Sequence, residues 1–214
     1  MNEEVTIINT NTRNEKIKNF FIKNKQNLVI AILVIVITLI GFFVLDKAKQ
    51  KKKTRLANQY NSAVINYSIG KKENIVEELT YLVNEKDKTY SPLSLYFLID
   101  NNLIENRDEV NNLFNILIQK TSLETEIKDL IIYKKALFNS EFLGENELIQ
   151  ILNPIINSKS TWKSHALYFM AEYFYSKNER EKSKEFFNQI IALVDGNSDI
   201  KLESQKRLNR DFGE

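Results

Sequence analysis

The chain has 214 residues, with no cysteine, one histidine and five glycines, and it carries 30 Lys or Arg against 28 Asp or Glu. These counts exclude disulfides, a thiolate or multi-histidine metal site, and a Cys-His nucleophilic pair, and the glycines are too dispersed for a phosphate-binding loop. The charge is uneven. Residues 46–55 hold six basic residues and one acid, whereas residues 56–214 hold nineteen and twenty-four, a formal charge of −5. That acidic balance argues against nucleic acid as a partner.

The first 27 residues form a short polar segment. Residues 1–15 are rich in Asn, Thr and charged side chains without any period, which predicts a tail with no regular structure. Ile17, Phe20 and Phe21 follow at helical spacing, and the lysines around them can reach lipid headgroups. We expect this part to be an amphipathic helix that leads into the next segment.

Residues 28–45, LVIAILVIVITLIGFFVL, contain no charged side chain. Eighteen residues of α-helix are about 27 Å long, close to the thickness of the hydrocarbon layer of a membrane. A buried core helix would show a polar stripe, and a cleaved signal peptide would be followed by small residues rather than by the observed DKAK. The segment is therefore predicted to be an uncleaved transmembrane helix. Five basic residues precede it and six follow it, so the positive-inside rule does not orient it.

Helical periodicity continues from there to the end of the chain. No Gly or Pro occurs between Leu45 and Gly70, so the transmembrane helix is predicted to continue to a C-terminal cap at Gly70. Pro154 should bend or shorten the helix that contains it. No segment shows strand periodicity with hairpin turns, and the predicted class is all-α. Further helices are predicted after caps at Asn74 and Ser91, around Val110 to Ile118, from Ser122, and after a turn at Gly144. The last three are predicted to cover 162–176, 179–194 with Asn178 as cap, and 200–208.

The predicted helices recur at a nearly constant spacing. Val76, Val110, Leu148 and Ser183 occupy similar places in successive helical pairs, at intervals of 34, 38 and 35 residues, whereas a tetratricopeptide repeat has about 34. Residues 166–195, ALYFMAEYFYSKNEREKSKEFFNQIIALVD, resemble that repeat most clearly. The matching positions are Met170, Ala171, Phe174, Ser183, Phe187 and Ile190, while Leu167, Asn178 and Asp195 depart from the pattern. The resemblance implies a tetratricopeptide-like helical-hairpin solenoid over residues 46–214.

Such a solenoid has a concave surface built from the first helix of each pair. The residues predicted to line it, called the predicted groove residues below, are Tyr96, Tyr133, Leu137, His165, Tyr168, Glu172 and Tyr175. Tyrosine suits a protein-binding surface because it offers apolar area together with a hydroxyl that tolerates water. An acidic, aromatic groove favours an extended apolar or basic segment. The alternative is that each tyrosine is half-buried packing between helical pairs.

No constellation for catalysis is apparent. Carboxylate pairs such as Glu77-Glu78 and Asp108-Glu109 lie on helix faces among Lys and Asn, which is typical of solvated surface. We therefore expect a protein without enzymatic activity and without a cofactor.

The whole arrangement resembles one family. A segment reading EKIKNFFIKNKQNL, a transmembrane helix ending in GFFVL, and a following helix reading RLANQYNSAVINY are similar to the ancillary subunit of the bacterial SecYEG translocon. This resemblance implies a cytoplasmic segment at 1–27, a single inner-membrane span at 28–45 and a periplasmic repeat domain at 46–214. It also implies association with the translocon and with a periplasmic peptidyl-prolyl isomerase chaperone. The alternative hypothesis is a cell-envelope scaffold for division or outer-membrane assembly machinery.

Overall fold

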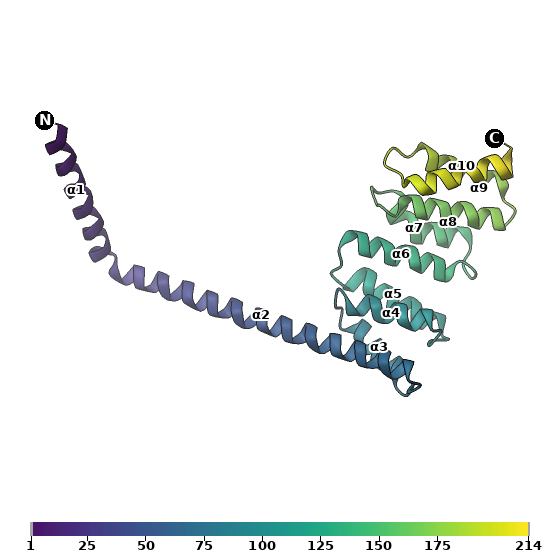
Figure 1. Ribbon diagram of the computed structural model, residues 1–214, viewed down its shortest axis with the longest axis horizontal. Helices are drawn as coiled ribbons and strands as arrows, with labels where there is room; N and C mark the ends of the chain where they lie inside the picture. Colours follow the sequence, from purple (N-terminus) through teal and green to yellow (C-terminus); the bar gives the residue numbers. More distant parts are fainter. Residues whose placement is uncertain (1, 214) are drawn as a thin grey trace. The chain divides into compact units, whose positions relative to one another are not determined.

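The computed structural model describes the backbone of residues 2–213, and the side chains of residues 13–213 (Figure 1). Within the described residues the protein is all-α, with ten α-helices, one π-helical segment and no strand. The prediction of an all-α protein is confirmed. The chain divides after Arg55 into two units, which are described separately below.

The first unit consists of α1 (Asn2–Lys23) and the first part of α2 (Lys25–Ser68). The sequence predicted no regular structure before residue 16, whereas the structure has helix from Asn2 onward; Met1 lies outside the described residues. The stretch contains no Gly or Pro, so nothing in it interrupts the helical ladder of backbone hydrogen bonds. The difference shows that polar composition alone does not decide against a helix.

Helix α2 is continuous over 44 residues, as predicted, and ends close to Gly70. Gly70 has φ +82°, a conformation that glycine adopts without strain, and the N–H of Lys71 donates to the carbonyl oxygen of Asn66 at 2.9 Å. Among the described residues, α2 is the one helix long and apolar enough to cross a membrane, and none of its most apolar stretch is buried. The helix therefore contains the candidate transmembrane segment.

The second unit begins within α2 and is made of packed helical pairs. Helix α3 packs against α4, α6 against α7, and α8 against α9, which also contacts α10. Figure 1 shows these helices layered one upon the next, from the blue α3 to the yellow α10. The elements after α2 are α3 (Ile75–Asn84), α4 (Tyr90–Asp100), α5 (Arg107–Asn115), the π-helical η1 (Ile116–Lys120), α6 (Thr125–Asn139), α7 (Glu145–Ile156), α8 (Lys163–Ser176), α9 (Arg180–Ala192) and α10 (Ser198–Phe212).

Several helix starts differ from the prediction by a few residues. Ser91 was expected to cap α4, but the helix begins at Tyr90, and the Ser91 hydroxyl instead donates to the carbonyl oxygen of Leu82 at 2.7 Å. The N–H groups of Thr89 and Tyr90 at this start donate to the carboxylate of Asp87. Helix α6 likewise begins at Thr125, after Glu124 rather than after a cap at Ser122. At α4 the difference reflects the side-chain hydrogen bonds of Asp87 and Ser91.

Asn178 was predicted to cap α9, and this is also wrong. Asn178 has φ +62° in the turn between α8 and α9, and Glu179 occupies the capping position. Asparagine tolerates this left-handed conformation better than most residues other than glycine. Asn178 thus makes the turn that a glycine makes in the tetratricopeptide pattern.

Helices α3, α5 with η1, α7 and α9 each bury residues at the same three positions, i, i+4 and i+7, and successive sets are spaced by 35, 38 and 35 residues. The predicted register was wrong by one residue in the first pair, because Val76 is 36% exposed whereas Ile75 is 2% exposed. Pro154 lies in the last turn of α7, which ends at Ile156. The buried triplets are Ile75, Leu79 and Leu82; Val110, Phe114 and Leu117; Leu148, Leu152 and Ile155; and Ser183, Phe187 and Ile190.

Candidate functional site

The predicted groove residues lie on α4, α6 and α8, where they form three local groups rather than one continuous column. Tyr96 comes from α4, Tyr133 and Leu137 come from α6, and the other four come from α8. All are half-buried except Leu137, which is 40% exposed. Each group sits where one of these helices meets its neighbour, so its environment depends on what that neighbour supplies.

The first group borders a hollow between α4 and α6. Its volume is about 200 Å³, and its lining residues are Tyr96, Ile99, Asp100, Phe114, Lys134, Leu137 and Phe138. Phe114 is fully buried and Leu137 is exposed, so the hollow runs from the core to the surface. The Lys134 ammonium lies 4.0 Å from the centre of the Tyr96 ring, a cation–π contact that joins the two helices. A cavity of this size holds one aromatic or large aliphatic side chain.

The Tyr96 hydroxyl stands out within this hollow. It is buried and has no hydrogen-bond partner among the described residues. Burial, with a smaller contribution from the charge of Asp100, raises the pKa of Tyr96 well above its ordinary value. The hydroxyl therefore stays protonated and available as a donor. A buried donor without an acceptor costs about 1–3 kcal/mol, which a bound acceptor would recover.

The second group is an aromatic cluster between α6 and α8. The Tyr133 ring stacks on Trp162 at 5.7 Å between centroids, and it meets His165 and Phe169 edge-on at 6.1 and 6.3 Å. Burial lowers the pKa of His165, which favours the neutral imidazole. These side chains fill the space between two helices, so Tyr133 and His165 serve mainly as packing here.

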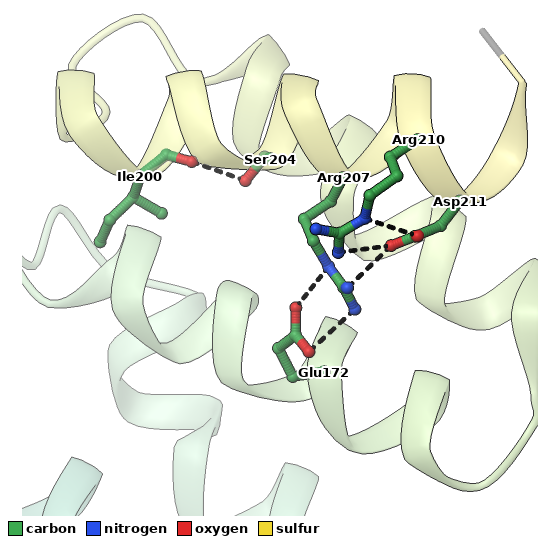
Figure 2. A network of polar contacts seen from close by, with 6 residues as sticks. All are labelled: Glu172, Ile200, Ser204, Arg207, Arg210 and Asp211. Atoms are coloured by element: carbon green, nitrogen blue, oxygen red, sulfur yellow. Dashed lines mark hydrogen bonds and ion pairs between the residues drawn. The ribbon is translucent and has the colours of Figure 1, made fainter.

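The third group is closed by α10. Figure 2 shows Arg207 reaching from α10 to the carboxylate of Glu172 on α8, with Nε 2.8 Å from Oε1 and Nη2 donating to Oε2 at 2.9 Å. The same guanidinium lies 2.7 Å from Asp211 and 4.4 Å from the centre of the Tyr175 ring. Its side chain is only 11% exposed. Glu172 and Tyr175 are therefore occupied by contacts within the chain.

Tyr168 belongs to the same closed region. Its ring meets Phe187 edge-on at 5.6 Å between centroids. Burial, followed by the charge of Glu172 and a hydrogen bond to it, raises the pKa of Tyr168 to about 12. The predicted groove residues thus separate into an open pair, Tyr96 and Leu137, and a set that neighbouring helices cover.

Several important residues were missed from the sequence. The helix expected at 200–208 continues to Phe212, so Asp211 was not placed on it. Arg207 and Asp211 are four residues apart on one helix, which is a detectable signal for an ion pair. The partner Glu172 lies 35 residues earlier and becomes visible only when the helices are aligned in space.

The paired carboxylates have a structural explanation. Glu77 and Glu78 lie in the first turn of α3, and Asp108 and Glu109 lie in the first turn of α5, where negative charge stabilises a helix. Among the described residues there is no group of three or more potential ligands that could hold a metal ion. No protein-family model, curated protein or solved structure matches the chain.

Proposed function

We propose that this protein is a membrane-anchored, non-catalytic adaptor whose tetratricopeptide-like repeat domain binds an extended segment of another protein between α4 and α6. The observation that carries the proposal is the hollow lined by the exposed Leu137 and by Tyr96, whose hydroxyl is buried and has no hydrogen-bond partner among the described residues. An apolar side chain of the bound segment fills the hollow, and a backbone carbonyl accepts the hydrogen bond from Tyr96. This mode combines apolar burial with one directional contact, as is common in protein recognition.

The anchor is the apolar part of α2. Residues 28–45 present apolar side chains around the whole helix, and none of this stretch is buried within the protein. A lipid environment satisfies that surface, whereas water does not. By resemblance to the ancillary translocon subunit, the N-terminus lies in the cytoplasm and the repeat domain lies in the periplasm of a bacterial inner membrane.

The same resemblance supports the SecYEG translocon and a periplasmic peptidyl-prolyl isomerase chaperone as partners. In this proposal, the span associates laterally with the translocon while the repeats hold the chaperone or an emerging secretory chain. An extended secretory segment is a fitting ligand for the hollow, because unfolded chains expose apolar side chains and backbone carbonyls.

The test is co-purification from detergent-solubilised membranes, with Leu137→Glu compared against Leu202→Glu. Both leucines are exposed, but Leu202 lies on α10, away from the hollow lining. We expect the chaperone or a nascent secretory chain to be lost with Leu137→Glu and retained with Leu202→Glu. The proposal fails if the unmodified protein retains neither translocon nor chaperone.

A second variant separates this proposal from the envelope-scaffold alternative. Residues 28–45 are exchanged for an unrelated transmembrane sequence of equal length, which keeps the anchor and its topology. Lateral docking with the translocon should depend on the original sequence and be lost. A scaffold that works through its groove alone would keep its partners.

A further inference from the structure

A cluster of basic residues lies on α2, directly after the apolar stretch. Lys47, Lys49, Lys51, Lys52, Lys53 and Arg55, called the basic collar below, occupy nine residues with Asp46 as the only neighbouring acid. Asp46 accepts a hydrogen bond from the side chain of Gln50 at 2.8 Å. All residues of the collar are exposed, so a dense positive charge faces outward.

Helix geometry fixes where this charge lies relative to the apolar stretch. Helix α2 is unbroken across the junction, and each residue adds about 1.5 Å along its axis. The collar therefore covers about 3–15 Å beyond Leu45. If residues 28–45 fill the hydrocarbon layer, this is the depth of the lipid headgroups and the water just outside them, within a Debye length or two of the surface.

The charges are also spread around the helix. Successive residues are rotated by about 100°, so positions 47, 49, 51, 52, 53 and 55 occupy well over half of the circumference. A nucleic acid or an acidic protein surface would approach one side of a helix and would favour a one-sided stripe. A layer of headgroups surrounds the helix on every side and matches the observed arrangement.

We propose that the basic collar binds the phosphate groups of anionic phospholipids at the membrane surface on the repeat-domain side. Lysine suits this role because its long, flexible side chain lets the ammonium reach the headgroups from several positions along the helix. The proposal rests on α2 being the membrane anchor, as proposed above. It adds lipid-headgroup chemistry to that anchor and gives a role to the basic residues that follow the apolar stretch.

The experiment measures which lipids surround the end of the span. A single tryptophan reporter is placed there by Leu45→Trp, in a background with Trp162→Phe, the one native tryptophan. The full chain is reconstituted into phosphatidylcholine bilayers that contain either brominated phosphatidylglycerol or brominated phosphatidylcholine, both of which quench tryptophan on contact. The ratio of the two quenching efficiencies gives the relative affinity for the anionic lipid.

Two fourfold variants are compared. The collar variant changes Lys47, Lys49, Lys51 and Lys53 to Gln. The control changes Lys71, Lys88, Lys120 and Lys159 to Gln, which removes the same charge from exposed positions elsewhere. We expect about a fivefold or greater preference for phosphatidylglycerol at low salt in the unmodified collar and in the control. The preference should fall to near unity in the collar variant, or in the unmodified collar at 0.5 M salt.

Equal quenching by the two lipids would overturn the proposal, and so would a preference that survives in the collar variant or disappears in the control. No quenching by either lipid would instead show that Leu45 does not contact acyl chains, which would contradict the membrane anchor itself. The failure of the collar and the failure of the anchor are thus distinguishable.

Discussion

The two ends of the predicted groove differ in what covers them. Between α4 and α6, Tyr96 and Leu137 border an open hollow, and one hydroxyl has no partner among the described residues. Between α8 and α10, Arg207 binds Glu172 and lies against Tyr175 (Figure 2). The predicted groove residues at this end are therefore covered by contacts within the chain. Residues predicted to line the same groove are thus left at the border of a hollow at one end and bound within the chain at the other.

This contrast has a physical cause in how a stack of helical pairs ends. Each pair covers its predecessor, and the last pair needs a helix to cover its own exposed face. Helix α10 does this with Leu208, which is buried against α8 and α9, and with the guanidinium of Arg207, which contacts Glu172, Asp211 and the Tyr175 ring. The end covered by α10 thus contributes to the stability of the domain, and the proposed binding site lies at the other end.

The largest expected effect comes from removing a buried phenylalanine ring at each end of the predicted groove. Phe187→Ala and Phe114→Ala should each lower the free energy of unfolding by about 3–5 kcal/mol, because both rings are fully buried. Chemical denaturation of the full chain in detergent measures this. Only Phe114 lines the hollow, so only Phe114→Ala should also alter partner binding in conditions where the protein is folded. Equal loss of binding in both variants would contradict the difference between the two ends of the groove.

The next effect concerns the ion pair that closes the second end. Arg207→Ala leaves Glu172 and Asp211 without their shared cation and removes the contact with Tyr175. We expect a loss of about 1–3 kcal/mol in the free energy of unfolding, with partner binding unchanged. Arg210→Ala is the matched control, since that side chain is 63% exposed, and it should cost less than about 0.5 kcal/mol. Similar losses in the two variants would contradict a special role for Arg207.

A smaller effect tests the open end. Tyr96→Phe removes a buried hydroxyl that has no partner among the described residues, so the free energy of unfolding should stay the same or rise by up to about 1 kcal/mol. Partner affinity should fall about three- to tenfold, because the bound segment loses its hydrogen bond. Thermal unfolding and a binding titration on the same preparation measure the two quantities. A destabilised variant with normal affinity would assign the hydroxyl a purely structural role.

The smallest expected effect is a pH dependence of stability that comes from the second group, the aromatic cluster between α6 and α8. Burial lowers the pKa of His165 below its ordinary value of 6.5, so the unfolded chain binds this proton more tightly than the folded chain does. Stability from this residue is therefore complete above pH 6.5 and decreases as the pH falls below that value. We expect a decrease in Tm of no more than about 2 °C between pH 7 and pH 5.5 that is absent in His165→Phe. An identical pH profile in both proteins would remove this explanation.

Sequence periodicity was sufficient for the existence of the helices after residue 16 and for most of the core, because α3, α5 with η1, α7 and α9 each bury residues at i, i+4 and i+7. It misplaced the first repeat by one residue, since Ile75 and Val76 are adjacent and equally apolar. It also could not distinguish Leu137 from Glu172, which were both predicted to line the groove. In the structure Glu172 is bound by Arg207 of α10, whereas Leu137 is 40% exposed and borders the hollow.

The most direct test of the account is site-specific photo-cross-linking in intact membranes. A benzophenone amino acid is placed at Leu137, in the open hollow, and separately at Leu202, an exposed position on α10. We expect a cross-link to another protein from position 137, weakened by Tyr96→Phe, and none from position 202. Cross-links from position 202 alone, or equal cross-linking from both positions, would contradict a binding site between α4 and α6.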